Sequence, residues 1–430
     1  MAIIRSILAL ITCLLVSFFY FPFEFVALPG FNTKMMLAVL GFVFMGMELV
    51  KKRSFSISRE FLFLLLFAAS VSLASLLSIT LNQTPDTTYV SYIVSFSVWL
   101  SGAFAICCFL RAFHGSISVQ LVLDYLIAVA LMQCVAALWI DSSPNMARMV
   151  NSTINFGQNV SIETKRLYGF GATLDVAGAR FSAILVGIGF FLSEIKEKLP
   201  LHRRALYILS FLLISILGNM IARTTMVGMV IGLVITFVGI VFKPADDGND
   251  KTAAVLSWMF ILILGTLVCT YLYNTDPNAR KLFRFAFEGF FSLAEKGHWE
   301  VSSNEKLKTM VVFPETIHTW IIGDGYFMNS RYDINYLGNA TDQGFYMGTD
   351  VGYLRFIFYF GVIGLIPMMG VIIYSAVICM RRFREEQLLF LMALSVGLIV
   401  WLKVSTDILC FFALFLSAAA MLQESVEHDA

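Results

Sequence analysis

Long runs of apolar residues alternate with short polar connections along most of this chain. Each run has about twenty residues, which is the length that an α-helix needs to cross a bilayer. The predicted spans are Ile7–Ala27, Met35–Val50, Phe61–Leu81, Tyr89–Leu110, Val119–Ile140, Val176–Leu192, Ala205–Met220, Thr224–Phe242, Ala253–Leu272, Gly352–Tyr374, Gln387–Leu402 and Ile408–Leu422. We therefore expect an all-α polytopic membrane protein with about twelve transmembrane helices.

One polar stretch is long enough to hold a small folded unit, and it divides the chain into three segments. Residues 1–272 contain nine spans and an arginine-bearing outer loop at 141–180. Residues 273–350 form one large helical outer loop, and residues 351–430 contain three spans and a short cytoplasmic tail. The first span follows Arg5 as a signal peptide would, but its run is long and lacks a small-residue cleavage site, so we expect it to be uncleaved.

Basic residues predict the orientation, because cytoplasmic connections carry an excess of lysine and arginine. The connections with more basic residues contain Lys51, Arg203, Arg204, Arg381 and Arg384, and they alternate with connections that contain fewer. This pattern places both termini in the cytoplasm and the large loop outside.

Composition agrees with a membrane protein, since 59% of residues are hydrophobic and only 14% are charged. Soluble domains carry roughly 25% charged residues. The net charge of +1 gives no reason to expect nucleic acid as a partner. All seven cysteines lie in apolar runs, and the sequence has no C-x-x-C or histidine-rich pattern, so we expect neither a disulfide-stapled domain nor a metal site.

The outer loop at 141–180 ends in a sequence with Arg166, Gly169, Gly171, Asp175 and Arg180. Glycines allow close approach of the backbone to a ligand or another helix, and arginine presents a planar donor fork that matches phosphate. The alternative is that the two arginines are interfacial anchors.

Arg223 lies in a connection of almost no length between two spans. A charge at this depth needs a partner or a function. We expect Arg223 either to bind an anion or to pair with a distant carboxylate such as Asp407.

Ala279–Leu293 has the pattern of an amphipathic helix in the large loop. Arg280, Arg284 and Glu288 share one face, and phenylalanines lie toward the other. Such a helix either holds a long-chain lipid carrier or caps the bundle. Ser302–Glu305 has the spacing of a capping box further along, and Gly323-Asp-Gly325 predicts a turn.

Asp350 and Arg355 stand where the large loop enters the next apolar run. Partial burial makes an aspartate a good general base, because it raises the pKa toward neutral pH. The alternative is that Asp350 is the N-cap of the next helix.

The layout and these motifs resemble the bacterial Wzy-type O-antigen and capsular polysaccharide polymerases, and more distantly the O-antigen ligases. The matching motifs are Arg166-Leu-Tyr-Gly-Phe-Gly, Asp175, Ala179-Arg180, Ala222-Arg223-Thr224, and Gly323-Asp-Gly325 followed by Asp350 and Gly361. The ligases usually carry a histidine at the position of Asp350, so this departure favours a polymerase. The resemblance covers most of the chain by layout, while its motifs span few residues.

The resemblance implies an inverting, metal-independent glycosyl transfer at the periplasmic face of the bacterial inner membrane, with no cofactor. The donor would be an undecaprenyl-diphosphate-linked oligosaccharide, and the acceptor another lipid-linked repeat unit. Membrane lipids and a chain-length regulator protein would be the further partners, with no nucleic acid.

The same resemblance implies roles for single residues. Arg166, Arg180 and Arg223 would bind the diphosphate in place of a metal ion, with Arg284 as a weaker candidate. Asp350 would deprotonate the acceptor hydroxyl, with Glu288 as the reserve carboxylate. Asp175 would orient an arginine, and Arg355 would contact substrate.

Three alternatives remain open at the level of sequence. In these alternatives the chain would be an O-antigen ligase, a secondary transporter or flippase, or a non-catalytic partner of other membrane proteins. A transporter fits the number of spans, but the halves show no convincing repeat and the charges cluster at the ends of spans.

Overall fold

The computed structural model describes residues 2–52, 58–156, 166–194, 200–242, 248–329 and 344–429. Its contacts divide the chain into two compact units. Unit 1 comprises Met1–Leu37, Phe109–Trp299 and Glu385–Val396, and unit 2 comprises Ala38–Cys108, Glu300–Arg384 and Gly397–Ala430. Helices α2 (Thr33–Lys52), α4 (Tyr92–His114) and α17 (Gln387–Val400) contribute residues to both.

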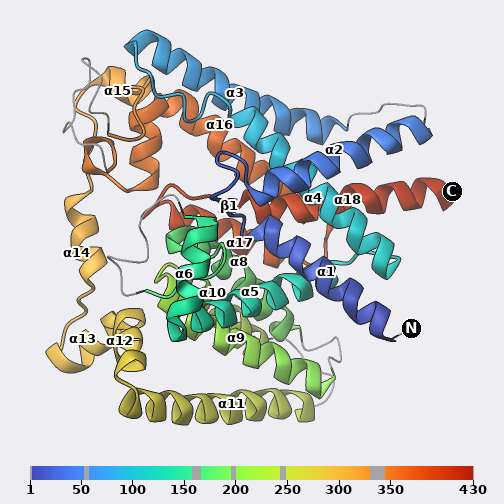
Figure 1. The fold of residues 1–430 in the computed structure, drawn as a ribbon, viewed down its shortest axis with the longest axis vertical. Helices are drawn as coiled ribbons and strands as arrows, with labels where there is room; N and C mark the ends of the chain where they lie inside the picture. The colour runs from blue at the N-terminus through green and yellow to red at the C-terminus, as the bar shows by residue number, and fades with distance from the viewer. Residues whose placement is uncertain are drawn as a thin grey trace. The chain divides into compact units, whose positions relative to one another are not determined.

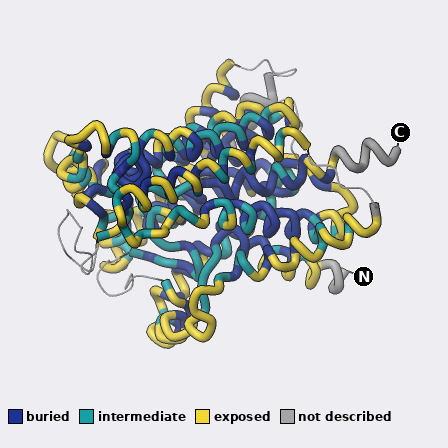
Figure 2. The backbone as a smooth tube through the Cα atoms, turned by 90° about the horizontal axis from the view of Figure 1, so that it is seen from above, coloured by how far each residue is buried: buried dark blue, intermediate teal, exposed yellow. Residues whose placement is uncertain are grey.

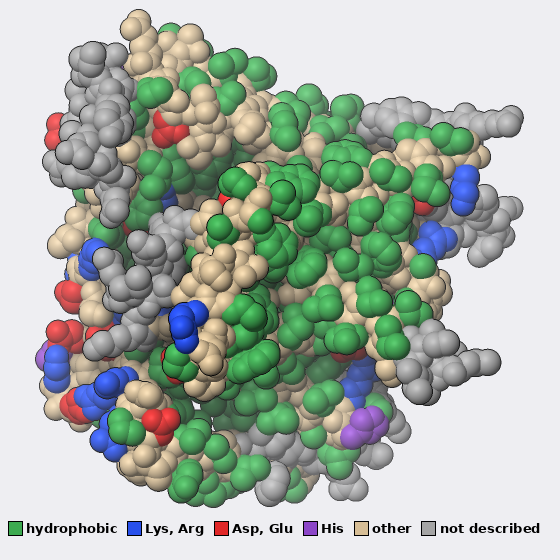
Figure 3. Space-filling view, in the orientation of Figure 1, with side chains coloured by type: hydrophobic (Ala, Val, Ile, Leu, Met, Phe, Trp, Pro, Cys, Tyr) green, Lys and Arg blue, Asp and Glu red, His purple; other side chains and the backbone are tan. Residues whose placement is uncertain are grey.

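The described residues form an all-α, multi-pass membrane protein. Eight of their helices are long and apolar enough to cross a bilayer, and four shorter apolar helices accompany them. Each of the twelve predicted spans overlaps one of these helices. Many of the helices keep an exposed side (Figure 2), and hydrophobic side chains are widespread on the surface (Figure 3). The number of crossings and the outer placement of the large loop remain predictions.

Unit 1 contains nine further α-helices and one short two-stranded sheet in the part that the structure describes. These elements are α1 (Ala2–Tyr20), β1 (Glu24–Phe25), α5 (Val119–Ser142), α6 (Pro144–Thr153), β2 (Ile154–Asn155), α8 (Leu174–Ser193), α9 (Leu201–Ile221), α10 (Thr225–Phe242), α11 (Gly248–Thr275), α12 (Pro277–Ala286) and α13 (Glu288–Lys296) (Figure 1). The strands β1 and β2 pair antiparallel, with Phe25 opposite Ile154.

The core of unit 1 is α8, which is buried at every residue from Ala177 to Ser193. Its main neighbour is α10, and glycine allows their backbones to approach closely. A Cβ atom added to Gly228 would lie 2.2 Å from the Cα atom of Ser182. The Ser182 hydroxyl accepts a hydrogen bond from the Gly228 amide at 3.1 Å and donates one to the Thr224 carbonyl at 3.0 Å. Small residues that let backbones touch are typical of helix packing in membranes.

The predicted helix Ala279–Leu293 is wrong as a single element. The chain leaves helical geometry at Phe287 (φ −118°, ψ 31°), so that α12 ends at Ala286 and α13 begins at Glu288. Arg284 and Glu288 therefore lie on different helices.

Unit 2 contains the remaining elements of the described chain. They are α3 (Arg59–Asn82), α14 (Ser302–Thr309), α15 (Ile317–Ile321), the 3₁₀ turn η1 (Tyr346–Gly348), α16 (Gly352–Arg382) and α18 (Leu409–Asp429), with most of α2 and α4. Within this unit α16 packs on α3, α15 and α18. The capping-box prediction is wrong, because the N-cap of α14 is Val301 and its side chain makes no cap.

A break divides α16 at Gly361, whose φ of 64° and ψ of −170° are not helical. The break removes helix amides that would otherwise reach the carbonyls of Phe358 and Tyr359. The predicted turn at residues 323–325 supplies replacements, since Asp324 N–H donates to Phe358 at 2.6 Å and Gly325 N–H donates to Tyr359 at 3.1 Å. Satisfied backbone groups are required at membrane depth, and the turn provides them.

Candidate functional site

Unit 1 fixes the segment that begins at Arg166 by several contacts. The Leu167 amide donates to the carbonyl of Met220 on α9, and the Phe170 amide donates to the Gln133 side chain on α5 at 2.9 Å. A Cβ atom on Gly171 would lie 2.1 Å from the carbonyl oxygen of Phe21. The sequence predicts that these glycines let the backbone approach either a ligand or another part of the protein. The contact of Gly171 is of the second kind.

Arg166 and Arg223 meet on one aromatic ring. Their guanidinium carbons lie 5.0 Å and 4.6 Å from the ring centroid of Phe285 on α12. The two cations are therefore within about 10 Å of each other, a distance at which partly buried like charges still repel. Cation–π contact with Phe285 holds both in place without neutralising either.

The pKa of Arg166 is lowered from its ordinary value. Burial is the largest cause and the positive charge of Arg223 adds to it, while the negative charge of Asp175 opposes both. A polyanion bound between the arginines would raise the pKa of Arg166 again, because its negative charge would oppose the effects of burial and of Arg223.

Asp175 lies in the first turn of α8 and accepts a hydrogen bond from the hydroxyl of Thr224. This bond ties the start of α8 to the turn between α9 and α10, next to Arg223. A carboxylate in the first turn of a helix is also favoured by the helix dipole.

The side chain of Arg223 forms an ion pair with Glu288, the first residue of α13. The Arg223 side chain is 14% exposed and that of Glu288 is 33% exposed. Arg223 therefore pairs with a distant carboxylate, as one of the two alternatives predicted. The partner is Glu288 and not Asp407, which belongs to unit 2.

Two other predicted arginines of unit 1 have different surroundings. Arg180 is 7% exposed within α8, and its backbone carbonyl accepts a bond from the hydroxyl of Tyr20. Arg284 is half-exposed and pairs with Glu295 at 2.7 Å. Its pKa is raised by hydrogen bonds to Glu295 and Tyr273. Arg284 therefore does not share the carboxylate of Arg223.

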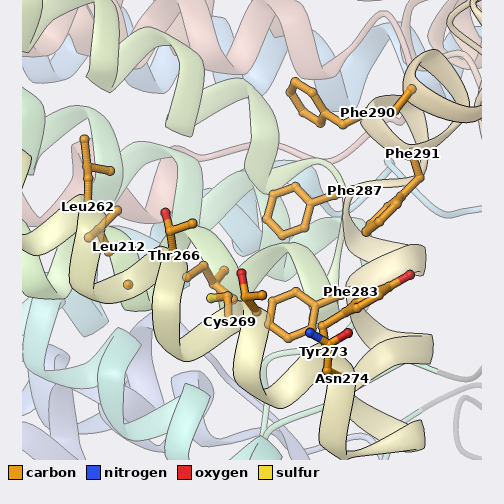
Figure 4. A pocket seen from close by; sticks show the side chains of 14 residues that line it. Leu212, Leu262, Thr266, Cys269, Tyr273, Asn274, Phe283, Phe287, Phe290 and Phe291 are labelled. Atoms are coloured by element: carbon orange, nitrogen blue, oxygen red, sulfur yellow. The ribbon is translucent and has the colours of Figure 1, made fainter.

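Unit 1 also contains an apolar groove of about 570 Å³, which lies between α9, α11 and the pair α12–α13. The phenylalanines of the predicted amphipathic pattern line it (Phe283, Phe287, Phe290 and Phe291), as Figure 4 shows. Phe285 is not part of this lining. The chain from 283 to 291 thus presents aromatic rings to the groove and one ring to the two arginines.

Unit 2 contains the other two predicted site residues. Asp350 forms an ion pair with Arg355 at 3.7 Å, and their side chains are 24% and 7% exposed. The N-cap alternative for Asp350 is wrong, because α16 begins after Val351. Arg355 lies between the rings of Phe327 and Phe345, at 3.7 Å and 4.0 Å from their centroids.

The structure adds two residues that sequence reasoning missed. Phe285 joins the arginines of unit 1, and only its place two residues from the groove-lining Phe283 and Phe287 distinguishes it in the sequence. In unit 2, Asp324 accepts hydrogen bonds from Thr319 at 2.7 Å and Tyr346 at 3.1 Å. Burial raises the pKa of Asp324, while these hydrogen bonds oppose the shift.

In the described residues, then, unit 1 brings together Arg166, Arg223, Asp175 and Glu288 around Phe285, which we name the arginine site. Its donors suit a phosphate-bearing ligand, because guanidinium groups make paired hydrogen bonds to phosphate oxygens. Neither a protein-family model nor a curated protein sequence matches this chain.

Proposed function

We propose that this chain is a bacterial inner-membrane glycosyltransferase that polymerises undecaprenyl-diphosphate-linked oligosaccharides into surface polysaccharide. The transfer inverts the anomeric centre, needs no metal ion and takes place at the periplasmic face. The approach of Arg166 and Arg223 to one ring carries this proposal, because it concentrates two cations where one diphosphate needs both.

The arginine site acts on the leaving group in this proposal. As the glycosidic bond breaks, negative charge grows on the diphosphate, and fixed guanidinium groups stabilise it more than they stabilise the bound substrate. Asp175 supports this part of the site from α8 through its hydrogen bond with Thr224 and its charge beside Arg166.

In this proposal, the Glu288 carboxylate contacts Arg223 where a phosphate oxygen of the donor binds. Its carboxylate pairs with Arg223, so a ligand must offer more negative charge than one carboxylate in order to displace it. A diphosphate does so by contacting both arginines at once. A sugar with a single carboxylate does not, which makes Glu288 a determinant of specificity for diphosphate donors.

The first test is activity of the purified protein. Incubation with a lipid-diphosphate oligosaccharide should yield a ladder of longer chains, and the ladder should be unchanged by EDTA because arginines replace the metal ion. Electrophoresis of the released glycans measures the product. Products that vanish with EDTA and return with Mg²⁺ would refute the metal-independent mechanism, and transfer only to a lipid A–core acceptor would identify a ligase.

A pair of carboxylate variants tests which group activates the acceptor. Asp350→Asn should lower kcat by about 10²–10⁴-fold, the usual contribution of a general base. Glu288→Gln should leave kcat within about tenfold and lower the KM for the donor, because it frees Arg223 from a competing carboxylate.

Both carboxylate variants replace an acid by its own amide and keep its size. Initial rates over a range of donor concentrations separate kcat from KM. The opposite outcome, in which Glu288→Gln loses kcat and Asp350→Asn does not, would assign the base to α13 and leave Asp350 as the partner of Arg355.

A further inference from the structure

The apolar groove of unit 1 has the size and lining of a site for a hydrocarbon chain. Its volume of about 570 Å³ is within the range of small-molecule sites. Phenylalanine rings from α12 and α13 form one wall, and α11 forms another with Leu262, Thr266 and Cys269 (Figure 4). No charged residue is part of this lining.

Two arginines stand at the edge of this groove. Arg284 donates a hydrogen bond to the hydroxyl of Tyr273 and lies 5.2 Å from the ring centroid of Phe291. Arg280 lies 5.3 Å from the ring centroid of Tyr273 and donates to its carbonyl. Both rings line the groove. The sequence of α12 also contains Lys281 and no acidic residue, while Glu295 of α13 pairs with Arg284 at this rim.

The groove lies among exposed apolar side chains. Leu267 and Val268 of α11 are 63% and 49% exposed, and Phe290 and Leu293 of α13 are 50% and 49% exposed. Exposed apolar residues on this scale mark a surface that contacts lipid, a ligand or another protein. A chain can therefore enter the groove sideways from the bilayer, with its headgroup at the arginine rim.

We propose that this groove binds one acyl chain of an anionic phospholipid, whose phosphate contacts Arg280 and Arg284. A single phosphodiester suits this rim, because the Arg284–Glu295 pair is about half-exposed and therefore weak enough to exchange for a lipid phosphate. The more buried arginine site suits a diphosphate. The proposal rests on the membrane character of the chain and on the geometry of unit 1, and it does not depend on the proposed enzymatic function.

Photo-crosslinking tests this site directly. The full chain is placed in phosphatidylcholine nanodiscs with phosphatidylglycerol that carries a diazirine on one acyl chain. After illumination, peptide mass spectrometry locates the attached lipid. We expect labels concentrated on residues 262–294, and competition by unlabelled phosphatidylglycerol but not by added polyprenyl phosphate or phosphatidylcholine.

Charge variants test the rim. A lysine or arginine near the surface contributes about fivefold to binding of an anionic lipid, so Arg280→Gln with Arg284→Gln should lower groove labelling by about 25-fold. Glu295→Gln should raise labelling, because it removes the carboxylate that competes for Arg284. If the Arg284–Glu295 ion pair had only a structural role, labelling of the groove would not rise in this variant.

Volume variants test the groove. Thr266→Trp fills it and should abolish labelling at residues 262–294, whereas Leu267→Trp adds the same ring next door on the exposed side of α11 and should not. Labels spread evenly over the exposed apolar helices would overturn the proposal. So would equal labelling after both rim arginines are removed, or displacement by polyprenyl phosphate in place of phosphatidylglycerol.

Discussion

Replacing Arg223 or Arg166 by alanine should abolish chain extension while the protein remains in the membrane. Each guanidinium group would stabilise the departing diphosphate, and loss of one donor of this kind typically costs about 10²–10³ in rate. Each substitution also leaves the other arginine alone on the ring of Phe285. The measurement is the initial rate of polymer formation by purified protein, together with the glycan length made in cells.

Lysine variants refine this test, because lysine keeps the charge and loses the planar donor fork. Arg223→Lys should retain part of the activity. The matched control is Arg148→Ala. Arg148 is an exposed arginine of the predicted outer loop that also contains Arg166, and in α6 its side chain donates a hydrogen bond to Asn145. This variant should polymerise normally. Long polymer from both Arg166→Ala and Arg223→Ala would end the assignment of these residues to the diphosphate.

Gly228→Leu should give the largest loss of stability. The new side chain begins 2.2 Å from the backbone of Ser182, so α10 must move away from α8 or the helices must bend. Overpacking of a rigid contact costs typically 1–3 kcal/mol and sometimes more, which for a chain of 430 residues corresponds to a fall of a few °C in Tm. The measurement is the temperature at which half of the detergent-solubilised protein loses its monodisperse peak.

Gly46→Leu is the control for this substitution. Gly46 lies in α2, and a Cβ atom there would meet nothing within 4 Å. The exchange of glycine for leucine within a helix is the same in both variants, and only the space differs. Equal melting temperatures for the two variants would show that the α8–α10 contact is less tight than its geometry indicates.

The helices of this protein could be predicted because their signal is local. An apolar run of sufficient length predicts a helix wherever it occurs, and each predicted span overlaps one. The break at Phe287 could not be predicted, because the apolar period continues through it. Next to the break, Gly289 makes a tertiary contact that has no local signal, because a Cβ atom there would be 2.3 Å from the indole ring of Trp299.

The arginine site could be predicted only in outline. Arg166 and Arg223 both lie in connections assigned to one side of the membrane, so their approach was a reasonable inference from topology. Glu288 was named as a carboxylate in reserve, but its ion pair with Arg223 spans 65 positions and has no local signal. The pattern at 283–291 likewise indicates an apolar face without showing that Phe285 leaves it for the arginines.

The junction between residues 323–325 and the broken α16 means that this membrane helix is not complete on its own. Two of its carbonyls, at Phe358 and Tyr359, accept hydrogen bonds from amides that lie more than thirty positions before them in the chain. During biosynthesis the span therefore reaches its final hydrogen-bonded state only after that earlier segment has docked. Exchange of the loop between related proteins would have to carry the turn and the glycine break together, since loss of the turn removes the amide donor of the Phe358 carbonyl and leaves that of Tyr359 with the Ser78 hydroxyl.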